Sequence, residues 1–136
     1  MRSVYIDVHD LQLDLRTSSG AQPITFLLDS LRMRGALAIP VAGTEADRDR
    51  DYLAAVRSIV ARDKRGACLR LTDNDLVEPH TLAASIASVL DSLALDPSEL
   101  DVILDFRFVG NRNPDTLRGI ALDALQGIHH LARAQK

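Results

Sequence analysis

The stretch of sequence that decides the fold is Val102-Ile103-Leu104-Asp105-Phe106-Arg107-Phe108. Its even-numbered residues are all apolar, whereas its odd-numbered residues include Asp105 and Arg107. Side chains alternate between the two faces of a β-strand, so this pattern predicts a strand with one apolar face and one largely polar face. The stretch Val4-Tyr5-Ile6-Asp7-Val8-His9 near the N-terminus has the same alternation and predicts a second strand of the same kind.

Strand-like segments recur along the chain about every 32 residues. The predicted strands are residues 4–9, 36–41, 67–71 and 102–108. Each is followed by residues with helical spacing, and these helices are predicted from Pro23 to Gly35, after Thr44, from Pro79 to about Asp96, and from Pro114 onward. This order indicates a βα repeat.

Strands that are separated by helices usually run parallel, with right-handed crossovers. An open sheet with helices on both sides needs two apolar faces. A barrel instead packs one apolar face against its helices and carries polar residues inside, near the C-terminal ends of the strands. The alternating strands therefore predict an α/β fold with a parallel (βα)4 half-barrel-like arrangement, which is part of a TIM-barrel-like fold or assembles into one.

Three segments carry a resemblance to a known family: residues 95–105 (LDPSELDVILD), residues 66–71 (GACLRL) and residues 38–41 (AIPV). Through them the chain resembles the beta family proteins of phages and bacteria. The resemblance runs from the first strand to the last helix. It implies a longer protein that forms a complete βα barrel, of which this chain corresponds to a part. It also implies a phage or mobile-element setting, but it brings no established reaction and no catalytic residues.

Length and composition limit the function classes. The 136 residues suffice for one domain, residues 1–136, with a single core. A net charge of -3 disfavours nucleic-acid binding, and the longest apolar run is far too short for a membrane span. A single cysteine, Cys68, indicates a reducing, cytoplasmic compartment. No Walker, GxGxxG or GxSxG motif occurs, so we expect no cofactor.

The candidate ligand-binding residues are polar residues on the inward faces of the predicted strands: Asp7, His9, Arg70, Asp105 and Arg107. An arginine between two carboxylates can bind an anion or orient an acid-base group. The same residues can instead form an ion network whose role is only structural. The two readings remain open from the sequence.

The segment Thr72-Asp73-Asn74-Asp75 offers carboxylates to a divalent cation, but it lacks the glycine and the terminal glutamate of a calcium loop. A turn and capping role is the preferred interpretation, and no metal site is predicted.

Two functional hypotheses follow. In the first, the chain acts through protein contacts, because four βα units leave open sheet edges. Either a homodimer or the missing remainder of a longer chain then completes the barrel. In the second, the chain is a small-ligand or anion-binding enzyme with its site at the C-terminal ends of the strands.

Overall fold

The computed structural model describes residues 3–12, 14–44, 50–76, 79–107 and 109–134. Strands and helices alternate, as the repeat predicts. The elements in chain order are β1 (Ser3–Ile6), α1 (Pro23–Met33), β2 (Leu37–Gly43), α2 (Arg50–Asp63), β3 (Ala67–Thr72), α3 (Asp73–Leu76), α4 (Pro79–Leu93), the 3₁₀ helix η2 (Pro97–Glu99), β4 (Leu100–Asp105) and α5 (Pro114–Ala134).

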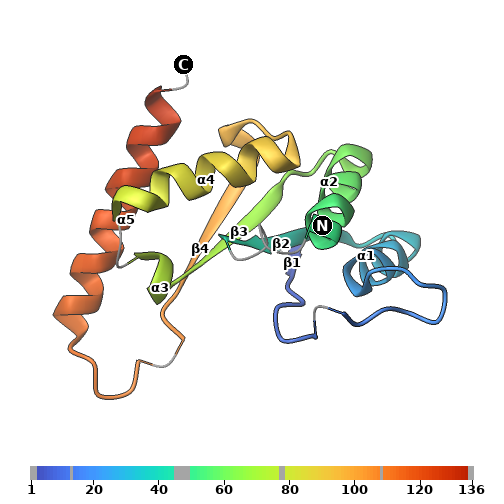
Figure 1. Ribbon diagram of the computed structural model, residues 1–136, viewed down its shortest axis with the longest axis horizontal. Coiled ribbons are helices and arrows are strands. Elements are labelled where there is room, and N and C mark those ends of the chain that lie inside the picture. The colour runs from blue at the N-terminus through green and yellow to red at the C-terminus, as the bar shows by residue number, and fades with distance from the viewer. Residues whose placement is uncertain (1–2, 13, 45–49, 77–78, 108, 135–136) are drawn as a thin grey trace.

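The four strands form one parallel sheet in the order β1-β2-β3-β4. The sheet is curled into half of a barrel, and the long helices α1, α2, α4 and α5 follow one another along its outer side (Figure 1). Consecutive strands are therefore neighbours, and the predicted parallel half-barrel is confirmed. The other side of the sheet is the concave inner face of the half-barrel.

The helix ends follow the local sequence signals. Pro23 begins α1, where its fixed φ suits the first turn and its missing N–H costs nothing. The side chain of Asn113 accepts a hydrogen bond of 2.8 Å from the backbone N–H of Asp115 and so caps α5. Beyond α1 the chain turns at Gly35, whose φ of 73° is one that glycine adopts without strain. These three helix signals were readable from the sequence.

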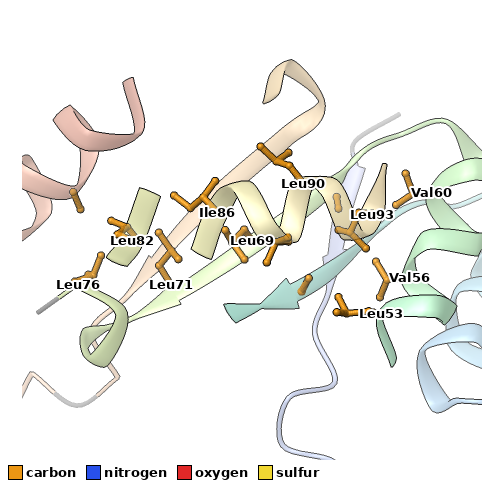
Figure 2. Packing of buried hydrophobic residues seen from close by; sticks show 14 residues of the cluster. Leu53, Val56, Val60, Leu69, Leu71, Leu76, Leu82, Ile86, Leu90 and Leu93 are labelled. Atoms are coloured by element: carbon orange, nitrogen blue, oxygen red, sulfur yellow. The ribbon is translucent and has the colours of Figure 1, made fainter. Parts of the chain in front are cut away.

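The main core lies between the outer face of the sheet and the helices. Leu69 and Leu71 of β3 are fully buried beneath α4, which contributes Ile86, Val89 and Leu93 (Figure 2). Side chains of α2, including Val56 and Val60, extend the same cluster. A second cluster joins Ile24 and Leu28 of α1 to Ala38 of β2. Odd-numbered residues of β3 and even-numbered residues of β2 thus face the helices.

Two strands end earlier than the sequence pattern predicts. Strand β1 ends at Ile6 rather than at residue 9, and β4 ends at Asp105, before Arg107. Phe108, the predicted end of that strand, lies outside the described residues. The reason is the same in both places: an aspartate side chain accepts the backbone N–H two residues later, which is an Asx turn and bends the chain out of the sheet.

None of the helices in the described ranges has both the length and the apolar character that crossing a lipid bilayer requires.

Candidate functional site

Arg70 stands at the centre of the candidate site, on the inner face of β3. Its Nε donates a hydrogen bond of 2.8 Å to Oδ2 of Asp105, and its Nη2 donates to the same oxygen. Its Nη1 donates a hydrogen bond of 2.9 Å to Oδ2 of Asp7. The guanidinium therefore joins the carboxyl ends of β1 and β4, the two outer strands of the sheet.

The room for this link comes from β2. Strands two places apart in a sheet lie roughly 10 Å from each other, so Arg70 must reach across β2 to contact the segment that follows β1. The residue of β2 that pairs in register with Arg70 is Gly43, which has no side chain to stand in the way. The glycine thus lets the guanidinium extend over the inner face.

Asp7 and Asp105 have equivalent surroundings in two different repeats. Oδ1 of Asp7 accepts the backbone N–H of His9 at 2.8 Å, and Oδ1 of Asp105 accepts that of Arg107 at 2.7 Å. In each carboxylate the other oxygen binds Arg70. Each aspartate therefore ends its strand and holds the central arginine at the same time.

The electrostatics agree with this geometry. The backbone hydrogen bond from Arg107, followed by the hydrogen bond from Arg70, lowers the pKa of Asp105. The hydrogen bonds and negative charges of Asp105 and Asp7 raise the pKa of Arg70. Both groups are consequently charged at neutral pH, and the guanidinium is largely engaged by protein carboxylates.

A second link crosses the inner face closer to the amino ends of the strands. The hydroxyl of Tyr5 on β1 donates a hydrogen bond of 2.9 Å to Oδ2 of Asp101 on β4. In a flat four-stranded sheet these strands would lie roughly 14 Å apart, so the contact requires the strong curl of this sheet. Between the two links, Ile39, Val41 and Cys68 form a small buried apolar cluster.

Cys68 belongs to that inner cluster and does not act as an exposed nucleophile. Its side chain is fully buried, and burial raises the pKa of the thiol to about 11. A thiol of this kind is protonated and unreactive at neutral pH.

A pocket of about 240 Å³ opens beside Arg70, at the C-terminal ends of β1, β2 and β3. It is bounded by the segment after β1, the start of α1, the end of β2, one residue of α2, and the junction of β3 with α3. Its lining includes Asp7, His9, Gln22, Tyr52, Arg70 and Asp75. This is the end of a βα barrel at which ligand sites are built.

Asp75 holds the junction of β3 and α3. Its Oδ2 accepts the backbone N–H of Thr72 at 2.7 Å and the hydroxyl of the same residue at 2.8 Å. Its Oδ1 accepts the hydroxyl of Thr44, the residue that follows β2. The turn and capping interpretation of residues 72–75 is confirmed, and no cluster of side chains that could hold a metal ion occurs among the described residues.

The structure brings Asp7, Arg70 and Asp105 together, as their positions on the strands predict. His9 also lines the pocket, but from the segment beyond β1. Arg107 lies past the end of β4 with a left-handed backbone (φ 51°) and an exposed side chain, and it is not among the pocket residues described. The ligand-binding role of these five residues stays a prediction.

Tyr52 and Gln22 are among the pocket residues that sequence reasoning missed. Tyr52 of α2 donates its hydroxyl to the backbone carbonyl of Val41. Gln22 precedes α1 without capping it, and its Nε2 is a buried donor with no hydrogen-bond partner in the described structure. The position of Gln22 before Pro23 marks it as a helix-start residue, but no local signal places Tyr52 near the end of β2.

Comparison with known proteins supports the family resemblance. No curated protein and no solved structure matches the chain. A family model described as Beta protein matches residues 1–134, nearly the whole sequence. The chain therefore belongs to the Beta protein family.

Proposed function

We propose that this protein acts through protein contacts, as one half of a βα barrel that a second copy of the chain completes. The observation that carries the proposal is the state of the two outer strands. In the described part of the chain, β1 pairs with β2 alone and β4 pairs with β3 alone. Each outer strand therefore presents a row of backbone groups that favours pairing with another strand.

Exposed apolar side chains occur on the helices nearest to the two open edges. The outermost helix at the β1 end is α1, where Phe26 and Met33 are exposed, and at the β4 end it is α5, where Leu122 and Leu125 are exposed. On the inner face, Tyr5 of β1 is also exposed. Exposed apolar groups that accompany an unpaired strand are typical of an interaction surface.

A second copy fits these surfaces better than an unrelated partner does. In a pair related by a two-fold axis along the barrel, the β4 edge of each copy meets the β1 edge of the other. All four edges are then paired in parallel, and the eight strands make the number found in a closed TIM barrel. The Arg70 and Tyr5 links support this assembly because they hold each half in a curled shape before it meets its partner.

Light scattering coupled to size-exclusion chromatography tests the proposal. We expect a particle with twice the mass of one chain. The variant Leu125→Glu places a charge one helical turn from Leu122 on the exposed surface of α5, where the native leucine is 52% exposed, and should shift the particle to a monomer. The matched control Leu15→Glu changes a residue of similar exposure, 42%, in the loop before α1, and should leave the dimer intact.

A monomer at millimolar concentration would overturn the proposed self-association. If backbone amides of β1 and β4 also exchanged rapidly with solvent in that monomer, the remainder of a longer chain would replace the second copy as the expected partner.

The proposal includes a setting in a phage or mobile element and in the cytoplasm. The first part rests on the resemblance of residues 38–41, 66–71 and 95–105 to beta family proteins of phages and bacteria, and the free buried thiol of Cys68 supports the second. Genes of phage type beside the coding sequence, and recovery of the protein in the cytoplasmic fraction of its host, are the expected observations. Neighbouring genes without phage character, or recovery outside the cytoplasm, would contradict them.

A second candidate function is binding of a small molecule in the pocket beside Arg70. The observation that favours it is a pocket at the C-terminal ends of three strands, which several polar side chains line. Saturable binding of a small molecule, followed through the backbone amide signals of Gly43 and Tyr52, tests this function.

A further inference from the structure

We infer that the pocket beside Arg70 takes a small organic cation, an amine with a short apolar body, rather than an anion. The inference rests on the second candidate function above and names its ligand class. It is argued from the charges that line the pocket, the hydrogen-bond partners of Asp75 and the apolar and aromatic walls.

The charges that line the pocket are predominantly negative. Asp7 and Asp75 each contribute a negative carboxylate to the lining, and Arg70 contributes one positive guanidinium. That guanidinium already binds Asp105, which lies outside the pocket, in addition to Asp7. An anion that approached Arg70 would have to compete with two carboxylates fixed by their own backbone hydrogen bonds. The pocket is therefore poorly suited to phosphate or carboxylate ligands.

Asp75 is the pocket carboxylate that we expect to bind the ligand's positive charge. Its hydrogen-bond donors are a backbone N–H and two hydroxyl groups, from Thr72 and Thr44. Within the described ranges, no arginine, lysine or histidine lies at ion-pair distance from it. A half-buried carboxylate without a cationic partner attracts one from solution.

The walls define the rest of the ligand. Val8, Leu11 and Val41 supply apolar surface, and Tyr52 supplies an aromatic side chain. Aromatic and apolar walls suit the carbon chain of an amine, and an aromatic face also attracts a cation. An inorganic cation is not favoured, because the carboxylates are not grouped as metal ligands in the described residues. The volume of about 240 Å³ admits a compact molecule, smaller than most drug-sized ligands.

The experiment compares two probes of equal size and opposite charge, n-butylammonium and butyrate, and adds inorganic phosphate. Each is titrated into the full 136-residue chain at about pH 8, where amines are protonated and ordinary histidines are neutral. Binding is followed through the backbone amide signals of Gly43, Thr44 and Tyr52. We expect saturable shifts with n-butylammonium and none with butyrate or phosphate.

Three variants assign the binding to the carboxylates. Asp75→Asn removes the charge with little change in shape and should weaken n-butylammonium binding about tenfold, as expected for the loss of a charge-assisted hydrogen bond. Asp7→Asn removes a charge from the same pocket on the segment after β1, and it replaces Asp75→Asn as the test variant if Asp75→Asn folds poorly. The matched control is Asp73→Asn, two residues away on α3, where the carboxylate pairs with Arg112. It should change the affinity less than about twofold.

The outcomes separate the inference from the function on which it rests. Saturable binding of butyrate or phosphate to the same residues would overturn the cation preference and leave a small-molecule site in place. Equal weakening by Asp73→Asn and Asp75→Asn would show general charge attraction and would also overturn it. Failure of all three probes to bind would contradict the ligand site itself.

Discussion

Removal of the central cation by Arg70→Met should destabilise the protein by about 2 kcal/mol. Loss of one partner from a fully buried ion pair typically costs about 3 to 5 kcal/mol, whereas an exposed pair contributes about 0 to 1 kcal/mol. The side chains concerned lie between these limits, with exposed fractions of 21% for Arg70, 34% for Asp7 and 26% for Asp105. Each carboxylate also keeps a backbone N–H donor when the arginine is gone. Both facts place the cost in the middle of the range.

Urea denaturation followed by circular dichroism at pH 7 measures this free energy of unfolding. A loss of about 2 kcal/mol corresponds to a melting temperature that is lower by about 6 to 8 °C for a chain of this size. The control variant Arg112→Met removes the ion pair with Asp73, which joins the segment before α5 to α3. Because Arg112 is more exposed than Arg70, at 37%, this variant should cost less than about 1 kcal/mol.

A double-mutant cycle with Asp105→Asn identifies the source of the loss. The losses of unfolding free energy in the two single variants should add up to about 1 to 2 kcal/mol more than the loss in the double variant, because Arg70 and Asp105 share hydrogen bonds. If Arg70→Met left the stability within about 0.5 kcal/mol of the parent, the inner ion network would not support the fold. A measured loss without coupling to Asp105 would refute the pairing as its cause.

Three further predictions concern other parts of the molecule. Gly66→Ala should lower the free energy of unfolding by about 3 kcal/mol or more, because a Cβ there would lie 2.0 Å from the carbonyl oxygen of Glu99. The control Gly35→Ala has a similar φ but open space around the added Cβ, and it should cost only about 1 kcal/mol. Equal losses of stability in thermal unfolding would contradict the clash at Gly66. The buried thiol of Cys68 should react with Ellman's reagent at about pH 8 only after unfolding, and rapid reaction of the native protein would show that the inner cluster is open. Hydrogen bonds from the backbone of Arg107 and from Arg70 hold the pKa of Asp105 below the ordinary value of 3.8, so its contribution to stability is present above that value and is lost as the pH falls through the folded pKa. Asp105→Asn should therefore flatten the fall in stability below about pH 4, and an unchanged slope would contradict this contribution.

The sequence by itself determined the order of the elements and the two faces of the sheet. Alternation within residues 4–9 and 102–108 depends only on the two-residue period of a strand, which every strand shares. The same period placed Arg70, between Leu69 and Leu71, on the inner face together with Asp7 and Asp105.

Tertiary structure alone decided where the strands end, how strongly the sheet curls and what forms the pocket. Residues 7–9 and 105–107 carry the strand pattern, but the side chains of Asp7 and Asp105 accept the backbone N–H groups two residues later and so withdraw them from the sheet. Among the described residues, β1 and β4 each have one neighbouring strand to oppose this. The curl is visible in the contact of Tyr5 with Asp101, residues far apart in the chain. The pocket combines Gln22, Tyr52 and Asp75 from separate repeats. Local periodicity specifies which face a side chain occupies, but the meeting of distant segments depends on how the whole chain packs.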